Sequence, residues 1–319
     1  MDPLRRACLA FALAVFALPS VAADYPAKPV RIIVASGPGS GDDFATRVLA
    51  DRLSAQTGQQ FVVENRPGAG GMIGQTAVAK APADGYTLLL AGGSMAGARF
   101  VNANVTYDLM KDFTPVSVIE TAPFALVVNP AIPAKTLQEF IAYARARPGK
   151  LTYGTIGAGQ TPYWAMLLLT SSAGIQAVEV PYKTTGEVMT DIMTGRTDFF
   201  FAPLVGAIAA KDKLKILGVS SAGRSDMLPE VPSIAEAGLP GYEMPAWRSI
   251  MGPAGLPRDV VTFLNREIQK ALASPDLRDR YLKAGSTPLG STPDELRKRY
   301  ETWMAIFGKI AKDTNLKPQ

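Results

Sequence analysis

The stretch that starts at Val30 reads as a buried strand, a glycine-rich loop and the beginning of a helix. Residues 30–35 form an apolar run rich in β-branched side chains, which is typical of a strand covered on both faces. Glycines in the loop 36–43 permit a tight turn and the close approach of a ligand. Asp42 or Asp43 is expected to cap the helix. Because the first N–H groups of a helix lack partners within it, this arrangement predicts an anion site.

The same order of elements returns further along the chain. A short apolar strand at 87–90 runs into a second glycine loop at 91–95. A strand beginning at 151 leads into a third loop, 155–161, which Pro162 ends as the first turn of a helix. Repeated strand, loop and helix predicts an α/β fold with a mostly parallel sheet, in which ligands bind at the carboxyl ends of the strands.

Two successive strands without a helix between them indicate a crossing between domains. They are expected at 113–120 and 124–128, and the segment 242–251 is expected to cross back. A chain of 319 residues has room for two domains of ordinary size. We therefore expect a first lobe from residues 24–122 and 247–319, and a second lobe from residues 123–246.

The first 23 residues have the composition of a signal peptide. Arg5 and Arg6 provide a positive start, and the apolar run 7–18 is too short to span a bilayer. An anchor helix at this end is the alternative. We expect cleavage near Ala23 and export to the periplasm, with the one cysteine, Cys8, removed together with the segment.

The composition excludes several classes of chemistry. The chain has no histidine, so the commonest general base and metal ligand is absent and Ser-His-Asp or Cys-His catalysis is impossible. The glycine loops match neither a nucleotide-hydrolysing nor a dinucleotide-binding pattern, so no cofactor and no metal is expected. The net charge of +5 is scattered without a basic run, which argues against nucleic acid as a partner.

Backbone N–H groups and hydroxyls in the three loops suit a carboxylate, although the glycines could also serve only as tight turns. Asp43 could act only as a helix cap, whereas Asp198 opens an apolar strand and is expected to hydrogen-bond to loop N–H groups or to a ligand. Tyr163 and Trp164 could stack on a flat ligand, with core packing as the alternative for Trp164. The ligand-binding candidates are Ser36, Gly37, Pro38, Gly39, Ser40, Asp43, Gly92, Ser94, Thr155, Gly157, Ala158, Gly159, Gln160, Thr161, Tyr163 and Asp198.

Several ordered motifs carry a family resemblance. They are YPAKPVR at 25–31, VVENRPGAGGMIG at 62–74, DGYTLL at 84–89, VPYK at 180–183 and LPEVPS at 228–233. The mature chain resembles the Bug family of periplasmic solute-binding proteins, the TctC-type receptors of tripartite tricarboxylate transporters. The resemblance implies two Rossmann-like lobes of the type II-like periplasmic binding protein architecture, with a ligand in the cleft between them. It also implies a small carboxylate ligand, transporter subunits as partners, a monomer and no catalysis.

The resemblance places the carboxylate between the loops 36–43 and 155–161. Within them the chain departs from the family, because Ser36 stands where a bulky aromatic is usual and Tyr163 where histidine is common. Thr184 replaces a glycine after Lys183 and joins the candidates. A small residue opposite aromatic ones suggests a bulkier or aromatic acid, and Ser36→Phe is predicted to weaken its binding.

Two other functions stay open at this point. An exported sensor would use the same cleft to signal to a protein partner in place of feeding transport. An enzyme acting on an organic acid is less favoured, because the mature chain has neither histidine nor cysteine.

Overall fold

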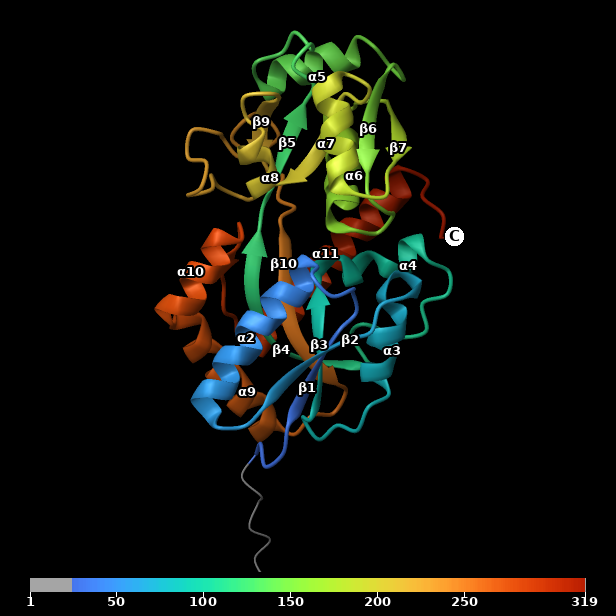
Figure 1. Ribbon diagram of the computed structural model, residues 1–319. Coiled ribbons are helices and arrows are strands. Elements are labelled where there is room, and N and C mark those ends of the chain that lie inside the picture. Colours follow the sequence, from blue (N-terminus) through green and yellow to red (C-terminus); the bar gives the residue numbers. More distant parts are fainter. Residues whose placement is uncertain (1–24, 319) are drawn as a thin grey trace, which may run out of the picture.

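The structure, a computed structural model, describes residues 25–318 and contains two β-sheets that form two lobes joined end to end (Figure 1). The first lobe has a six-stranded sheet of order β11-β4-β10-β3-β1-β2, and the second has a five-stranded sheet of order β7-β6-β8-β5-β9. This confirms the predicted α/β class. The predicted signal peptide, residues 1–23, lies outside the described residues. The division into 24–122 with 247–319 and 123–246 stays a prediction.

Three strands of the first sheet are parallel, as the strand-loop-helix stretch that starts at Val30 predicts. β1 (Val30–Val34) pairs with β2 (Phe61–Asn65) on one side and with β3 (Thr87–Gly92) on the other. Helices α2 (Gly41–Thr57) and α3 (Met72–Ala79) connect them. Because the three strands are parallel, their carboxyl ends meet at one edge, and in Figure 1 β3 points from there toward the second lobe.

The second lobe repeats this arrangement. β6 (Leu151–Thr155) leads through α6 (Thr161–Ala173) to β7 (Ala177–Pro181), and β6 is parallel to both β7 and β8 (Phe199–Pro203). β5 (Phe124–Val128) is antiparallel to β8. The remaining elements of this lobe are α5 (Leu137–Arg145), α7 (Thr185–Thr194), α8 (Leu204–Ala209) and β9 (Lys215–Val219).

Two antiparallel strands, β4 (Phe113–Ala122) and β10 (Ala246–Pro253), connect the lobes. β4 passes into β5 across Pro123, as predicted. The returning strand is shorter than predicted, because residues 242–245 belong to the second lobe. There Tyr242 is buried and its hydroxyl donates to the Ala165 carbonyl at 2.8 Å.

The C-terminal part of the chain covers the first sheet and then reaches the second lobe. α9 (Arg258–Ala273) and α10 (Pro275–Lys283) pack on α2, and the short strand β11 (Thr287–Pro288) pairs with β4. α11 (Pro293–Asp313) runs behind the crossing strands to α6, and the chain end lies beside the second lobe (Figure 1). Among residues 25–318, no helix is both long and apolar enough to cross a membrane.

Short helices in the glycine-rich loops were not predicted. They are η1 (Ala69–Gly71), η2 (Gly93–Gly97) and α4 (Ala98–Val101). Each is shorter than the span over which a hydrophobic period becomes visible in sequence. They shape the first-lobe wall of the cavity described next.

Candidate functional site

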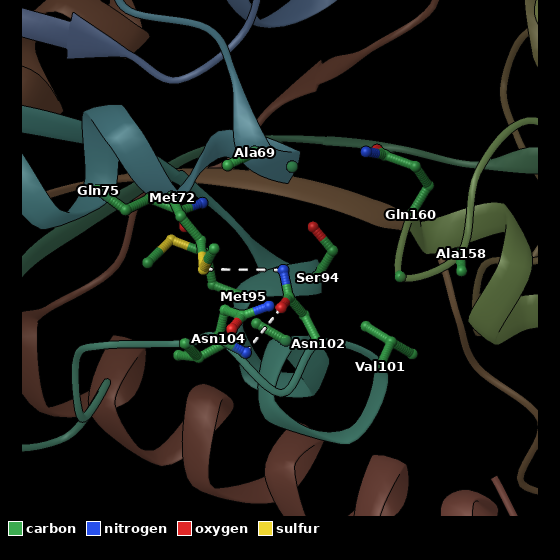
Figure 2. A pocket seen from close by; sticks show the side chains of 14 residues that line it. Ala69, Met72, Gln75, Ser94, Met95, Val101, Asn102, Asn104, Ala158 and Gln160 are labelled. Carbon is green, nitrogen blue, oxygen red and sulfur yellow. Dashed lines mark hydrogen bonds between the residues drawn. The ribbon is translucent and has the colours of Figure 1, made fainter. Parts of the chain in front are cut away.

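A cavity of about 410 Å³ lies between the two lobes, which is within the usual range for small-molecule pockets. The first lobe contributes residues near η1, α3, η2 and α4, and the second lobe contributes the loop before α6 (Figure 2). Four predicted ligand residues line it: Ser94, Ala158, Gly159 and Gln160. The other lining residues are Ala69, Gly70, Met72, Gln75, Met95, Ala98, Val101, Asn102, Asn104 and Val105.

The loop before α6 forms the second-lobe wall. Gly157 and Gly159 have φ values of 126° and 86°, a region that favours glycine. A Cβ atom at Gly159 would lie 2.8 Å from Val101 Cγ2, so a side chain there would press against the first lobe. In Figure 2 the Gln160 amide and the Ser94 hydroxyl point into the same space from opposite lobes.

The start of α6 is electrostatically suited to an anion. Its N-cap, Gln160, makes no side-chain capping bond, and its first turn, with Thr161 and Pro162, contains no acid. The first N–H groups and the positive end of the helix dipole are therefore not already neutralised by a carboxylate of the same turn. The start of α6 is therefore an anion-attracting feature of the cavity wall.

The first glycine loop does not line this cavity. Ser40 caps α2, in place of Asp42 or Asp43, because its Oγ accepts the Asp43 N–H at 3.2 Å. The Ser36 hydroxyl contacts Ser40 Oγ at 2.8 Å and donates to Asp42 Oδ2 at 3.2 Å. The loop hydroxyls are thus bonded within the loop, and the first turn of α2 already holds two carboxylates. None of the predicted ligand residues in this loop belongs to the cavity lining. They are Ser36, Gly37, Pro38, Gly39, Ser40 and Asp43.

A separate groove of about 540 Å³ lies on the first lobe beside α2 and β2, and Gly39 and Asp43 line it. Asp43 is buried there. Its Oδ2 accepts the Gly39 N–H at 2.9 Å, and its Oδ1 lies 2.9 Å from Arg47 Nη2. The Arg47 guanidinium beside Oδ1 lowers the pKa of Asp43 to about 2, against the opposing effect of burial, and the Gly39 N–H lowers this pKa further. Asp43 therefore stabilises the loop as an anion.

This pKa predicts a stability difference that depends on pH. The folded pKa of Asp43 lies below its unfolded value, so its contribution is complete above about pH 4 and is lost as the pH falls through about 2. We expect Asp43→Asn to lower the free energy of unfolding by about 1–2 kcal/mol at pH 7 and by far less at pH 2. The value at pH 7 allows for solvent screening, because Arg47 is half-exposed. Urea unfolding at both pH values measures this. The exposed Glu301→Gln is the control, and an Asp43→Asn cost that does not change with pH would contradict the assignment.

Arg248 on β10 joins the first loop to both crossing strands. Its Nε donates to Asp42 Oδ1 at 2.5 Å, and its Nη1 donates to Glu120 Oε1 on β4. The Ser286 hydroxyl donates to the other Glu120 oxygen at 2.5 Å. Burial lowers the pKa of Arg248, but the Glu120 and Asp42 carboxylates raise it more, so that it lies above its ordinary value. The guanidinium is thus bonded to two protein carboxylates. Arg248 pairs with Gly92, one of the predicted ligand residues, in the β3–β10 register.

Asp198 is a correction to the predicted site. It precedes β8, at the amino end of a strand whose carboxyl end faces the cleft. Its Oδ2 accepts the Thr152 N–H at 2.7 Å and the Thr152 hydroxyl at 3.1 Å. The predicted hydrogen bonding of this acid is present, but it joins β6 to β8, and Asp198 does not belong to the cavity lining. Within residues 25–318, no group of three or more His, Cys, Asp or Glu side chains is arranged to hold a metal ion.

Two predicted threonines have their hydroxyls bonded elsewhere. Thr155 is buried and donates to Glu179 Oε1 at 2.7 Å. Thr184 is exposed and accepts the Glu187 N–H at 3.3 Å in the capping box of α7. Neither belongs to the cavity lining.

The two aromatic residues at the start of α6 are packed inside the protein. Trp164 is fully buried and stacks on Phe307 of α11, with ring centroids 4.3 Å apart. Tyr163 is also buried, and its ring packs edge-on against the ring of Trp164, with centroids 5.8 Å apart. Core packing, the alternative for Trp164, therefore describes both residues, and neither lines the cavity where an aromatic ligand would stack on it.

The polar residues of the first-lobe wall were not predicted from the sequence. Gln75 lies on α3, and Asn102 and Asn104 follow α4. The amides are separated from the glycine loops in sequence and belong to no motif. For Arg248 a signal was present, namely a single cation inside the apolar strand that returns to the first lobe.

Comparison with known proteins identifies relatives along almost the whole chain. The pattern of the tripartite tricarboxylate transporter family receptor, TctC, matches residues 45–316. The UPF0065 protein in the tcbD-tcbE intergenic region of Pseudomonas sp. (strain P51) is 36% identical over 299 residues, which are 91% of this chain and 89% of that protein.

Solved structures agree with the fold. R. palustris Rpa4515 with adipate has a TM-score of 0.79 at 33% identity and covers 93% of this chain and 100% of its own. MatC (Rpa3494) from Rhodopseudomonas palustris with bound malate has a TM-score of 0.75 at 28% identity and covers 90% of this chain and 99% of its own. These similarities confirm the resemblance read from the sequence motifs and the two-lobe architecture.

Proposed function

Because the chain belongs to the tripartite tricarboxylate transporter receptor family, we propose that it captures a small organic carboxylate between its lobes for a membrane transporter of that type. The family is one of solute-binding receptors, and two solved relatives hold adipate and malate. Export to the periplasm, with residues 1–23 as the signal peptide, belongs to the same proposal. In support, two related structures are named as periplasmic proteins.

One observation carries the proposal. The cavity between the lobes has the uncapped, acid-free start of α6 on one side and the neutral wall of η2 and α4 on the other. A carboxylate near Ala158, Gly159 and Gln160 would meet backbone N–H groups and the positive end of a helix. Since the first loop already holds two carboxylates, the second-lobe loop is the better anion site of the two.

Capture would work through lobe closure. The lining residues come from both lobes, so a ligand reaches all of them together only when the lobes approach each other. A ligand with contacts to both lobes shifts the population toward the closed state. The transporter would then distinguish loaded from empty receptor by the relative position of the lobes.

A thermal-shift and calorimetry panel of succinate, malate, adipate, citrate and benzoate tests the proposal. At a ligand concentration of 100 times Kd, the bound form should gain about 2.7 kcal/mol and melt several degrees higher. A chain that binds neither these acids nor any other small carboxylate would contradict the proposed ligand class.

Gly159→Val should weaken binding of the best acid by at least about 10-fold, because the new side chain meets Val101 across the cleft. The matched control is Gly241→Val. Gly241 has a similar φ of 82° but no atom within 4 Å of its Cβ position, so it carries the same backbone strain without the clash. Equal affinity of the two variants would show that the loop before α6 does not close on the first lobe.

A further inference from the structure

The cavity has a polar lining without a single charged side chain. Among its 14 lining residues, Gln75, Asn102, Asn104 and Gln160 carry carboxamides, and none is an acid or a base. Cations in the neighbouring segments have other partners. Arg66 Nε lies 2.6 Å from a Glu64 oxygen, and the Arg99 guanidinium lies 5.1 Å from the centre of the Phe100 ring. An anionic group against this wall would lose hydration without meeting a counter-ion.

Two of the amides are held with their oxygens occupied. The Tyr107 hydroxyl donates to Gln75 Oε1 at 2.9 Å, and the Asn104 N–H donates to Asn102 Oδ1 at 2.8 Å. The bond that Asn102 Nδ2 makes is to a thioether, Met72 Sδ at 3.7 Å, and sulfur is a weak acceptor (Figure 2). The first-lobe wall therefore presents N–H donors that carry no positive charge.

We propose, resting on the function proposed above, that the ligand has a carboxylate at one end and an uncharged carbonyl at the other. The carboxylate would lie at the loop before α6, and the carbonyl would accept from Gln75 and Asn102. Neutral N–H donors satisfy an amide or ketone oxygen completely, whereas a second carboxylate would be desolvated beside them with no cation in the lining. The substrate class is therefore the monoamides and keto acids of short aliphatic chains, in preference to dicarboxylates.

Matched ligand pairs test this by calorimetry at pH 7. They are succinate with succinamate, glutarate with glutaramate, and adipate with adipamate, so that length is constant and only the charge of the far end changes. We expect the monoamide of the best-fitting length to bind at least about 10-fold more tightly than its dicarboxylate. A dicarboxylate that binds equally or better overturns this inference and leaves the proposed function standing. Binding of no member of any pair overturns both.

Variants locate the effect on the first-lobe wall. Gln75→Glu and Asn102→Asp keep the side-chain size but replace the donor, and each should weaken monoamide binding at least about 10-fold. Tyr107→Phe frees Gln75 Oε1 and should reduce the monoamide preference without abolishing carboxylate binding. Gln176→Glu makes the same chemical change at an exposed position outside the lining and should change nothing. Monoamide affinity unchanged in both Gln75→Glu and Asn102→Asp would overturn the assignment. Circular dichroism melting checks the fold, and the wild-type ligand pairs decide the question if a variant does not fold.

Discussion

Glu120→Ala is expected to lower the free energy of unfolding by about 3–5 kcal/mol, because it leaves the Arg248 guanidinium without its buried partner. The Glu120 side chain is 2% exposed and that of Arg248 is 18% exposed. The substitution also removes the nearer of two acceptors of the Ser286 hydroxyl and leaves the Tyr281 carbonyl at 3.2 Å. Asp42 remains bonded to Arg248, but its side chain is 43% exposed and does not replace a buried counter-ion. Urea unfolding at pH 7 measures the loss.

Two controls separate burial from simple loss of charge. Glu120→Gln keeps the size of the side chain and one oxygen for Arg248, so its cost should lie below that of Glu120→Ala. Asp279→Ala removes the partner of Lys283 in an exposed pair and should cost at most about 1 kcal/mol. A Glu120→Ala cost as small as that of Asp279→Ala would mean that the Arg248 network does not hold the crossing strands together.

Trp164→Ala is expected to cost about 3–5 kcal/mol, the usual range for emptying a large buried aromatic site. Trp164 belongs to α6 of the second lobe and stacks on Phe307 of α11, which continues through Trp303 to Trp247 on the crossing strand β10. These ring contacts couple the lobes through the C-terminal helix. The empty space left by Trp164→Ala should therefore destabilise both the second lobe and its packing against α11. Chemical unfolding followed by tryptophan fluorescence measures both effects.

Trp164→Phe provides the matched control. The indole N–H of Trp164 has no hydrogen-bond partner among the described residues, so phenylalanine removes an unsatisfied group and retains a ring against Phe307. Its cost should be well below that of alanine. Phe44→Ala is a second control, in which an aromatic side chain is removed from the surface. Because Phe44 is 39% exposed, this substitution should change the free energy of unfolding little. Equal costs for Trp164→Ala and Phe44→Ala would contradict the coupling of the lobes through α11.

The linear order of elements followed from local chemistry. A β-branched run predicted β1, and the strands predicted at 113–120 and 124–128 agree with β4 and β5. Local signals sufficed because propensity, capping and turn residues act over a few positions. They failed at the start of α2, where Ser40 took the capping role from the neighbouring aspartates.

The lining of the cavity was predicted in part. The loop 155–161 and Ser94 were correctly expected at the carboxyl ends of strands, because parallel strands bring these ends to one edge. Gln75 and Asn102 escaped prediction because nothing in their own segments indicates a shared wall. Asp198 was misjudged because an acid beside a strand looks the same in sequence at either end of it, and the direction of β8 decided its partner.

The sequence by itself determined the fold class, the repeated strand-loop-helix unit and the family, since each depends on residues close together in the chain. Only the tertiary structure decided which glycine loops line the cavity and which carboxylates bind Arg248. Asp42 and Glu120 lie 206 and 128 positions from it, and no short-range pattern links such residues. Their pairing depends on sheet order and lobe contact, which arise when the whole chain packs.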